Sequence, residues 1–315
     1  MDSSKVWKNF NLGSELQVAG TFLYNSLFHF SGMRNFNKDY ECFEVLYNAS
    51  VGIERLQKIC IILTEHTDSL NQEEFENELI THDHVKLMQR IKKSEKINLG
   101  PDHRNLLSLL KDFYKINRYE RFKLSSVSRT DDERFLFSKF IGFGLKISIN
   151  YEGFYPDPIT NQMRRYFGKA LIKISDILFN IIKDKSLNLG IFTIEMESFS
   201  KAYKIFLQKE ISFESELNFK REILIYLIAN ANTDSTINYL KQIQPLYLDG
   251  SIADYIEFLL NSTKNPSLTD ELHSRYDDMT ANEIKTRKKA IEVIGENLAY
   301  MDIDDENDID NDPFV

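Results

Sequence analysis

Residues 46–63 read LYNASVGIERLQKICIIL, and this stretch decides the fold. Its apolar side chains recur every three or four residues, at Leu46, Ala49, Ile53, Leu56, Cys60 and Leu63. That spacing holds them on one face of an α-helix for about five turns. A strand would need an alternation of two residues, which the stretch lacks. We therefore predict a long core helix here.

The same helical spacing recurs along the rest of the chain. Only 12 glycines and 6 prolines are spread over 315 residues, which disfavours sandwiches, barrels and glycine-looped nucleotide folds, because these need frequent tight turns. We predict an all-α protein, with Ser14, Thr81 and Asp102 as helix N-caps. The expected helices are 14–30, 46–63, one after Thr81, one after Asp102, 131–149, 160–184, 191–209, 213–230, 234–244, 250–263 and 280–300.

A break in the helical pattern divides the chain into two predicted domains. Gly153, Pro156 and Pro158 fall within eight residues of one another, so no helix should continue through residues 151–158. We expect a helical bundle over residues 1–150 and a second helical domain over 159–300. No fixed-period repeat is present, so a solenoid has no support.

The formal net charge of −9 is unevenly placed along the chain. Seven acidic residues and no basic residue lie in the last 14 positions. Such a run cannot bury enough apolar surface to offset the entropy of ordering it. We predict a disordered acidic tail over residues 301–315.

Several kinds of site are disfavoured by what the sequence contains. The two cysteines, Cys42 and Cys60, are too few for a disulfide framework or a four-thiolate zinc site, so we expect buried thiols in a reducing compartment. No phosphate-binding glycine loop and no nucleophile elbow is present. His82-x-His84 makes a poor metal pair on a helix. We expect a cytoplasmic protein with no cofactor, no metal and no membrane segment.

Three short elements of the first half occur in a recognisable order. An apolar helix carries an internal Glu and Lys, a later helix begins near a His, and a Tyr is followed by an Arg-Tyr pair. In this order they resemble the HEPN domain superfamily, the helical domain shared by higher eukaryotes and prokaryotes and named for nucleotide binding. The resemblance covers residues 14–150. The matching positions are Glu54 and Lys58, then His82, then Tyr114, Arg118 and Tyr119.

The resemblance implies a bundle of roughly four or five helices that is often a homodimer. Many members are RNA-cleaving toxins or antiviral effectors, and others are non-catalytic nucleotide-binding or interaction modules. The ribonuclease members carry an Arg followed by four to six residues and a His. In this sequence none of the six histidines lies at that distance after an Arg.

The residue types still predict a possible catalytic group. Metal-free RNA cleavage needs a base for the 2′-hydroxyl proton and a cation for the charged transition state. We assign these roles to His82 and Arg118, with Glu54 and Lys58, four residues apart, orienting them. The alternative is structural: Glu54 and Arg118 form an ion pair, and His82 is a hydrogen-bonding residue at a helix start.

The stretch from Lys111 to Arg129 is the best candidate for binding phosphates. It carries six basic residues against two acidic ones, interleaved with aromatic side chains that can stack on unpaired bases. The alternative is a solvated helical face with its aromatic side chains turned into the core. The candidate nucleic-acid-binding residues are Lys111, Lys115, Arg121, Lys123, Tyr114 and Tyr119.

Two functions follow from these patterns. One is an RNA- or nucleotide-directed protein of a bacterial defence or toxin system, for which a divergent metal-independent ribonuclease is the specific form we consider. The other is a non-catalytic scaffold that dimerises and binds a partner protein through its C-terminal helices. The missing Arg/His motif favours the second, and the basic aromatic stretch favours contact with RNA.

Overall fold

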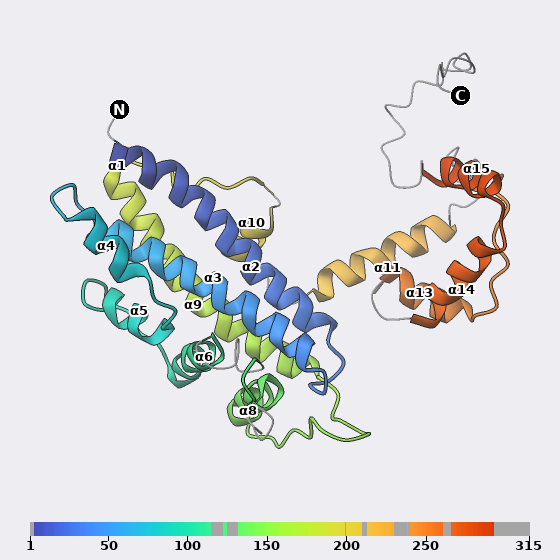
Figure 1. The fold of residues 1–315 in the computed structure, drawn as a ribbon, viewed down its shortest axis with the longest axis horizontal. Helices are drawn as coiled ribbons and strands as arrows, with labels where there is room; N and C mark the ends of the chain where they lie inside the picture. The colour runs from blue at the N-terminus through green and yellow to red at the C-terminus, as the bar shows by residue number, and fades with distance from the viewer. Residues whose placement is uncertain are drawn as a thin grey trace, which may run out of the picture. The chain divides into compact units, whose positions relative to one another are not determined.

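The computed structural model describes residues 3–114, 122–124, 132–198, 200–209, 213–229, 238, 240–260 and 266–292. Regular structure in these residues is helical, without a strand, so the all-α prediction is confirmed (Figure 1). The first helices are α1 (Ser3–Val6), the π-helix η1 (Trp7–Asn11), α2 (Leu12–Gly32), α3 (Asp39–Glu65), α4 (Gln72–Leu79), α5 (His84–Ile91) and α6 (Pro101–Asp112). The later ones are α8 (Glu133–Leu145), α9 (Asn161–Leu189), α10 (Lys201–Phe206), α11 (Glu214–Ala229), α13 (Ile252–Leu260), α14 (Pro266–Asp277) and α15 (Ala281–Glu292).

The core of the first half is built on α3. All six residues of its predicted apolar stripe are buried, which confirms the core helix. Figure 1 shows α2 and α9 running beside α3, and α5 and α6 pack against α3 and against each other. Two glycines allow close approach: a Cβ at Gly52 would lie 2.7 Å from Leu23 Cγ, and one at Gly20 would lie 2.5 Å from Ala202 Cα. The first contact joins α3 to α2, and the second joins α2 to α10.

The chain divides into two compact units, Met1–Glu214 and Ser215–Val315. The division therefore lies later than the stretch 151–158, where the sequence places it. That stretch is free of helix, as predicted, but α9 and α10 beyond it pack against α2 and α3. The buried side chains of α9 belong to the same apolar core as those of α3. The stretch 151–158 therefore interrupts the helices, but the same apolar core continues on both sides of it.

The loop itself is tied by hydrogen bonds between its ends. Asn150 N–H donates to the Asp157 carboxylate at 2.7 Å, and Asp157 N–H donates to the Asn150 carbonyl at the same distance. Gly153 has φ +80°, a conformation that glycine adopts without strain. At the tip, Phe154 and Tyr155 are 97% and 90% exposed.

Several helix ends differ from the prediction. Ser14 lies inside α2, because α1, η1 and α2 follow one another without a break. The N-cap of α5 is Asp83 rather than Thr81, since its carboxylate accepts the first free N–H groups of that helix. At α6 the N-cap is Gly100, and Asp102 lies in the first turn, where an anion is favoured by the helix dipole.

Both cysteines are free and buried, as predicted. Burial raises the pKa of each thiol, which keeps it protonated. The Cys60 thiol lies 3.3 Å from the carbonyl oxygen of Leu178 and joins α3 to α9. Both cysteines therefore serve as packing residues of the core.

The second unit contains α13, α14, α15 and nearly all of α11. Arg275 of α14 pairs with Asp249 at 2.7 Å. On α11 four aliphatic side chains are exposed: Ile223, Ile225, Leu227 and Ile228. The predicted tail, 301–315, lies outside the described residues. Among the described helices, none has the length and apolarity needed to cross a bilayer.

Candidate functional site around Glu54 and His82

Glu54 lies in the middle of α3 with its carboxylate buried, and each of its oxygens has a partner. Lys58, one turn later, places Nζ 2.7 Å from Oε1. His82 places Nδ1 2.9 Å from Oε2. The structure thus brings together three of the four predicted catalytic residues, and we call Glu54, Lys58 and His82 the Glu54 site. Arg118, the fourth, lies outside the described residues.

The contact with Glu54 orients the imidazole of His82. Residue 82 lies between α4 and α5, in the short connection 80–83 that we call the His82 loop. A carboxylate only accepts hydrogen bonds, so Nδ1 carries the proton and donates a hydrogen bond to Glu54. In the neutral ring this leaves the lone pair on Nε2, which has no partner among the described residues. The His82 side chain is 49% exposed.

An aromatic stack borders the site. The Tyr114 ring lies with its centroid 4.5 Å from that of His82, and the Tyr47 ring stacks on Tyr114 at 6.3 Å. Phe43, one turn before Tyr47 on α3, extends the stack at 5.9 Å. Tyr114 is only 8% exposed. It is therefore turned into the core, as the alternative interpretation of the basic stretch expects.

Three of the six predicted nucleic-acid-binding residues are described, and Tyr114 among them is buried. Lys111, at the end of α6, pairs with its neighbour Asp112 at 3.3 Å. Lys123 is exposed. The others, Lys115, Tyr119 and Arg121, lie outside the described residues, so their role stays a prediction.

Two further residues lie beside the site: Gln57, which the sequence analysis did not single out, and His84, which it considered only as half of a metal pair. Gln57 is fully buried on α3, and its amide Nε2 donates to the carbonyl of His84 at 2.8 Å. The ring of His84 is also fully buried, and burial lowers its pKa to about 4. The sequence gives little signal for Gln57, because residues 54–58 read ERLQK and four of these five side chains are polar.

The rings of His82 and His84 have different partners. His82 contacts Glu54, whereas His84 Nδ1 lies 3.4 Å from Gln57 Oε1. Within the described ranges, no group of three or more His, Cys, Asp or Glu side chains is placed to hold a metal ion.

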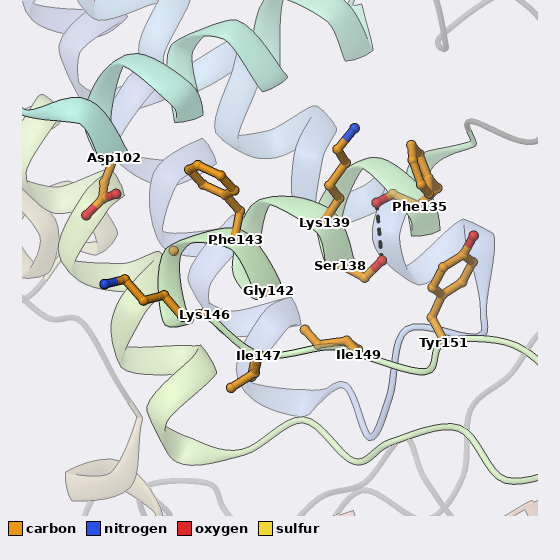
Figure 2. A pocket seen from close by; sticks show the side chains of 11 residues that line it. Asp102, Phe135, Ser138, Lys139, Gly142, Phe143, Lys146, Ile147, Ile149 and Tyr151 are labelled. Carbon is orange, nitrogen blue, oxygen red and sulfur yellow. Dashed lines mark hydrogen bonds between the residues drawn. The ribbon is translucent and has the colours of Figure 1, made fainter.

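An open groove of about 620 Å³ lies apart from the Glu54 site, along α8 (Figure 2). Here α8 ends at Leu145, and the chain turns back through Lys146, which has φ 56°. Figure 2 shows the ammonium groups of Lys139 and Lys146 pointing in different directions on either side of Phe143. The groove is mainly apolar. Its lining residues are Asp102, Phe135, Ser138, Lys139, Gly142, Phe143, Gly144, Lys146, Ile147, Ile149 and Tyr151.

The polar groups of the groove are bound elsewhere or point apart. Lys139 Nζ lies 5.0 Å from the centroid of the Phe135 ring, and the Ser138 hydroxyl donates to the Phe135 carbonyl. Burial, followed by a hydrogen bond with Asp102, raises the pKa of Tyr166 to about 12. Of the predicted site residues that the structure describes, none lines this groove.

The Glu54 site has the parts of a proton-transfer group: a buried carboxylate, a lysine that pairs with it, and a half-exposed imidazole. A carboxylate that holds Nδ1–H fixes the tautomer of the ring and stabilises its protonated form. No protein-family model, curated protein or solved structure matches this chain.

Proposed function

We propose that the first unit acts on RNA and that the Glu54 site takes part in metal-independent cleavage, with His82 as the general base. The observation that supports this most is the 2.9 Å hydrogen bond between His82 Nδ1 and the Glu54 carboxylate. It presents Nε2 as a proton acceptor on the half-exposed side of the ring. Imidazole suits this task because it changes charge near neutral pH.

The proposed reaction is an internal transfer at phosphorus. His82 Nε2 takes the proton of a ribose 2′-hydroxyl, the 2′-oxygen attacks the adjacent phosphorus, and the bond from phosphorus to the 5′-oxygen breaks. The leaving 5′-oxygen takes a proton from water, and the hydroxide so formed accepts the proton held by His82. The products are a 2′,3′-cyclic phosphate and a 5′-hydroxyl, with His82 neutral again. Glu54 stabilises the imidazolium, Lys58 holds the carboxylate, and Arg118 is the proposed cation at the phosphorane-like transition state.

Binding of the RNA is assigned to the basic stretch. Lys111, Lys115, Arg121 and Lys123 would contact phosphates, and Tyr119 would stack on an unpaired base. The HEPN resemblance supplies the proposed setting, a bacterial defence or toxin system in the cytoplasm. Because the contacts are ionic, affinity for RNA should fall steeply as salt is raised.

The test is incubation of the purified full chain with labelled tRNA and total RNA, with and without EDTA. His82→Asn and Arg118→Ala remove the proposed base and cation. His29→Asn is the matched control, because it breaks another histidine–glutamate pair in the same unit, 3.2 Å to Glu44. Cleavage that survives EDTA and His29→Asn but is lost in the other two variants supports the proposal. Cleavage unchanged in both His82→Asn and Arg118→Ala contradicts it.

A second candidate, a non-catalytic scaffold that binds a partner protein, is favoured by α11. Its four exposed aliphatic side chains form the kind of surface that soluble proteins bury against a partner. Sedimentation of the full chain, alone and as Ile225→Lys/Ile228→Lys, tests for self-association. A monomer in both forms, together with RNA cleavage by the wild type, would leave this candidate without support.

A further inference from the structure

One turn beyond Glu54, α3 also holds the first residue of α5, directly after the His82 loop. Gln57 Nε2 donates to the backbone carbonyl of His84 at 2.8 Å, and Gln57 Oε1 lies 3.4 Å from His84 Nδ1. Because an amide oxygen accepts, His84 Nδ1 is the donor of the second contact. One side chain of α3 thus binds both the backbone and the ring of the residue two positions after His82.

The His84 ring stays neutral at this position. It is fully buried, and burial lowers its pKa to about 4, against the opposing effects of Glu54 and Asp83. A charged ring here would compete with His82 and Lys58 for the Glu54 carboxylate. The neutral ring instead leaves that carboxylate to its two observed partners.

The residues on both sides of His82 are fixed as well. Asp83 is buried, and its carboxylate caps α5 by accepting the N–H groups of Val85 and Lys86 at 3.1 and 3.0 Å. On the other side, the Thr81 hydroxyl accepts the N–H of Asp83 at 3.3 Å. The backbone around His82 therefore has few alternatives once Gln57 holds His84.

We propose that Gln57 and His84 are positioning residues that hold the His82 ring against Glu54. Both are buried, so neither would touch RNA, and they act through the loop that carries His82. Small displacements of a catalytic group lower a rate strongly, which is why a base needs such support. The effect on cleavage rests on the proposed function, but the position of His82 is measured without RNA.

The experiment is NMR of the full chain with ¹⁵N-labelled histidine, in which His82→Asn identifies the His82 signals. Wild-type His82 should show the Nδ1–H tautomer and ring protons displaced upfield by the neighbouring Tyr114 ring. Gln57→Met removes both contacts with His84 at nearly constant volume. We expect the tautomer signals to average and the upfield displacement to fall by about half or more.

Ser26→Ala is the matched control. Its hydroxyl is also buried and donates to a backbone carbonyl between two helices, that of Val45 at 2.9 Å, but away from the His82 loop. Ser26→Ala should leave the His82 signals unchanged. If Gln57→Met does not fold, His84→Leu makes the same test, since it keeps the backbone bond and removes only the ring contact.

Unchanged His82 signals in the folded variant overturn the proposal. A fixed wild-type tautomer in a chain that cleaves no RNA leaves the positioning intact and counts against the proposed function alone. In a chain that cleaves RNA, Gln57→Met should lower kcat about tenfold while KM changes less than about twofold.

Discussion

The Glu54 site and the α8 groove hold their polar groups in opposite ways. At the Glu54 site, side chains from α3 and the His82 loop converge, and both carboxylate oxygens have partners within 3 Å. In the groove, the two lysines point apart and the lining is mainly apolar (Figure 2). The groove offers open volume, whereas the Glu54 site has the arranged donors and acceptors. Chemistry is therefore indicated by convergence of polar groups rather than by open volume.

The largest loss of stability is expected when the buried aromatic ring beside the Glu54 site is removed. Tyr114→Ala should lower the free energy of unfolding by about 3–4 kcal/mol, because its buried ring packs between those of Tyr47 and His82. Denaturation by urea measures the loss. Phe154→Ala, at a fully exposed position, is the control. A loss below about 1 kcal/mol for Tyr114→Ala would show that the stack contributes little.

Acid should lower the free energy of unfolding by protonating His84, beside the Glu54 site. Its pKa in the fold, about 4, lies below the ordinary histidine value of 6.5, so the unfolded chain binds the proton more tightly between these two pH values. Stability should therefore be fully present above about pH 6.5 and decline as the pH falls toward 4, by about 3 kcal/mol from this group.

Unfolding of the wild type and of His84→Asn at a series of pH values isolates this effect. The variant keeps a polar side chain beside Gln57 but has nothing to titrate. The wild type should lose more stability than the variant between pH 6.5 and 4. Parallel pH profiles would mean that His84 is as easily protonated in the fold as in the unfolded chain.

Sequence reasoning predicted the parts of the Glu54 site that follow from helical spacing. Glu54 and Lys58 are four residues apart, so their ion pair needs only the helix. His82 came from the family resemblance, since nothing in its own neighbourhood names a partner on α3. The pairing of Gln57 with His84 joins residues 27 positions apart. The sequence could not identify His84 as the partner of Gln57, because the order of helices along the chain does not fix which of their turns come into contact.

The fold shows a similar division. The stripe from Leu46 to Leu63 could be predicted from its spacing alone. The extent of the first unit could not, because Pro156 and Pro158 stop a helix but say nothing of where the next helix packs. None of the helices expected from the sequence covers α14, which begins at Pro266, although proline is well tolerated at the first position of a helix.

A smaller difference is expected when one ion pair is broken. Lys58→Met leaves a buried oxygen of Glu54 without its partner, so unfolding should become easier by about 1–2 kcal/mol. Lys38→Met, which breaks the exposed pair with Glu41, should change stability by less than about 0.5 kcal/mol. Thermal denaturation of the two variants side by side makes the comparison. Equal losses would place Glu54 in a solvated environment.

The smallest effect belongs to the groove. Phe143 is 74% exposed, so Phe143→Ser should change the free energy of unfolding by less than about 0.5 kcal/mol. It should also leave the NMR signals of His82 where they are. A loss near that of Tyr114→Ala would mean that the groove is closed in solution, and the contrast between the two regions would fail.

The hydrogen-bonded loop 150–157 has a consequence for the integrity of the chain. Its tip offers Phe154 and Tyr155 to a protease that cuts after aromatic residues. A cut there separates α8 from α9 in sequence, yet α9 remains packed against α3 in one core. The nicked protein should therefore elute from gel filtration as a single species and fall into two fragments only in denaturant. If so, the first unit could be divided at this loop into two chains that reassociate into the same core.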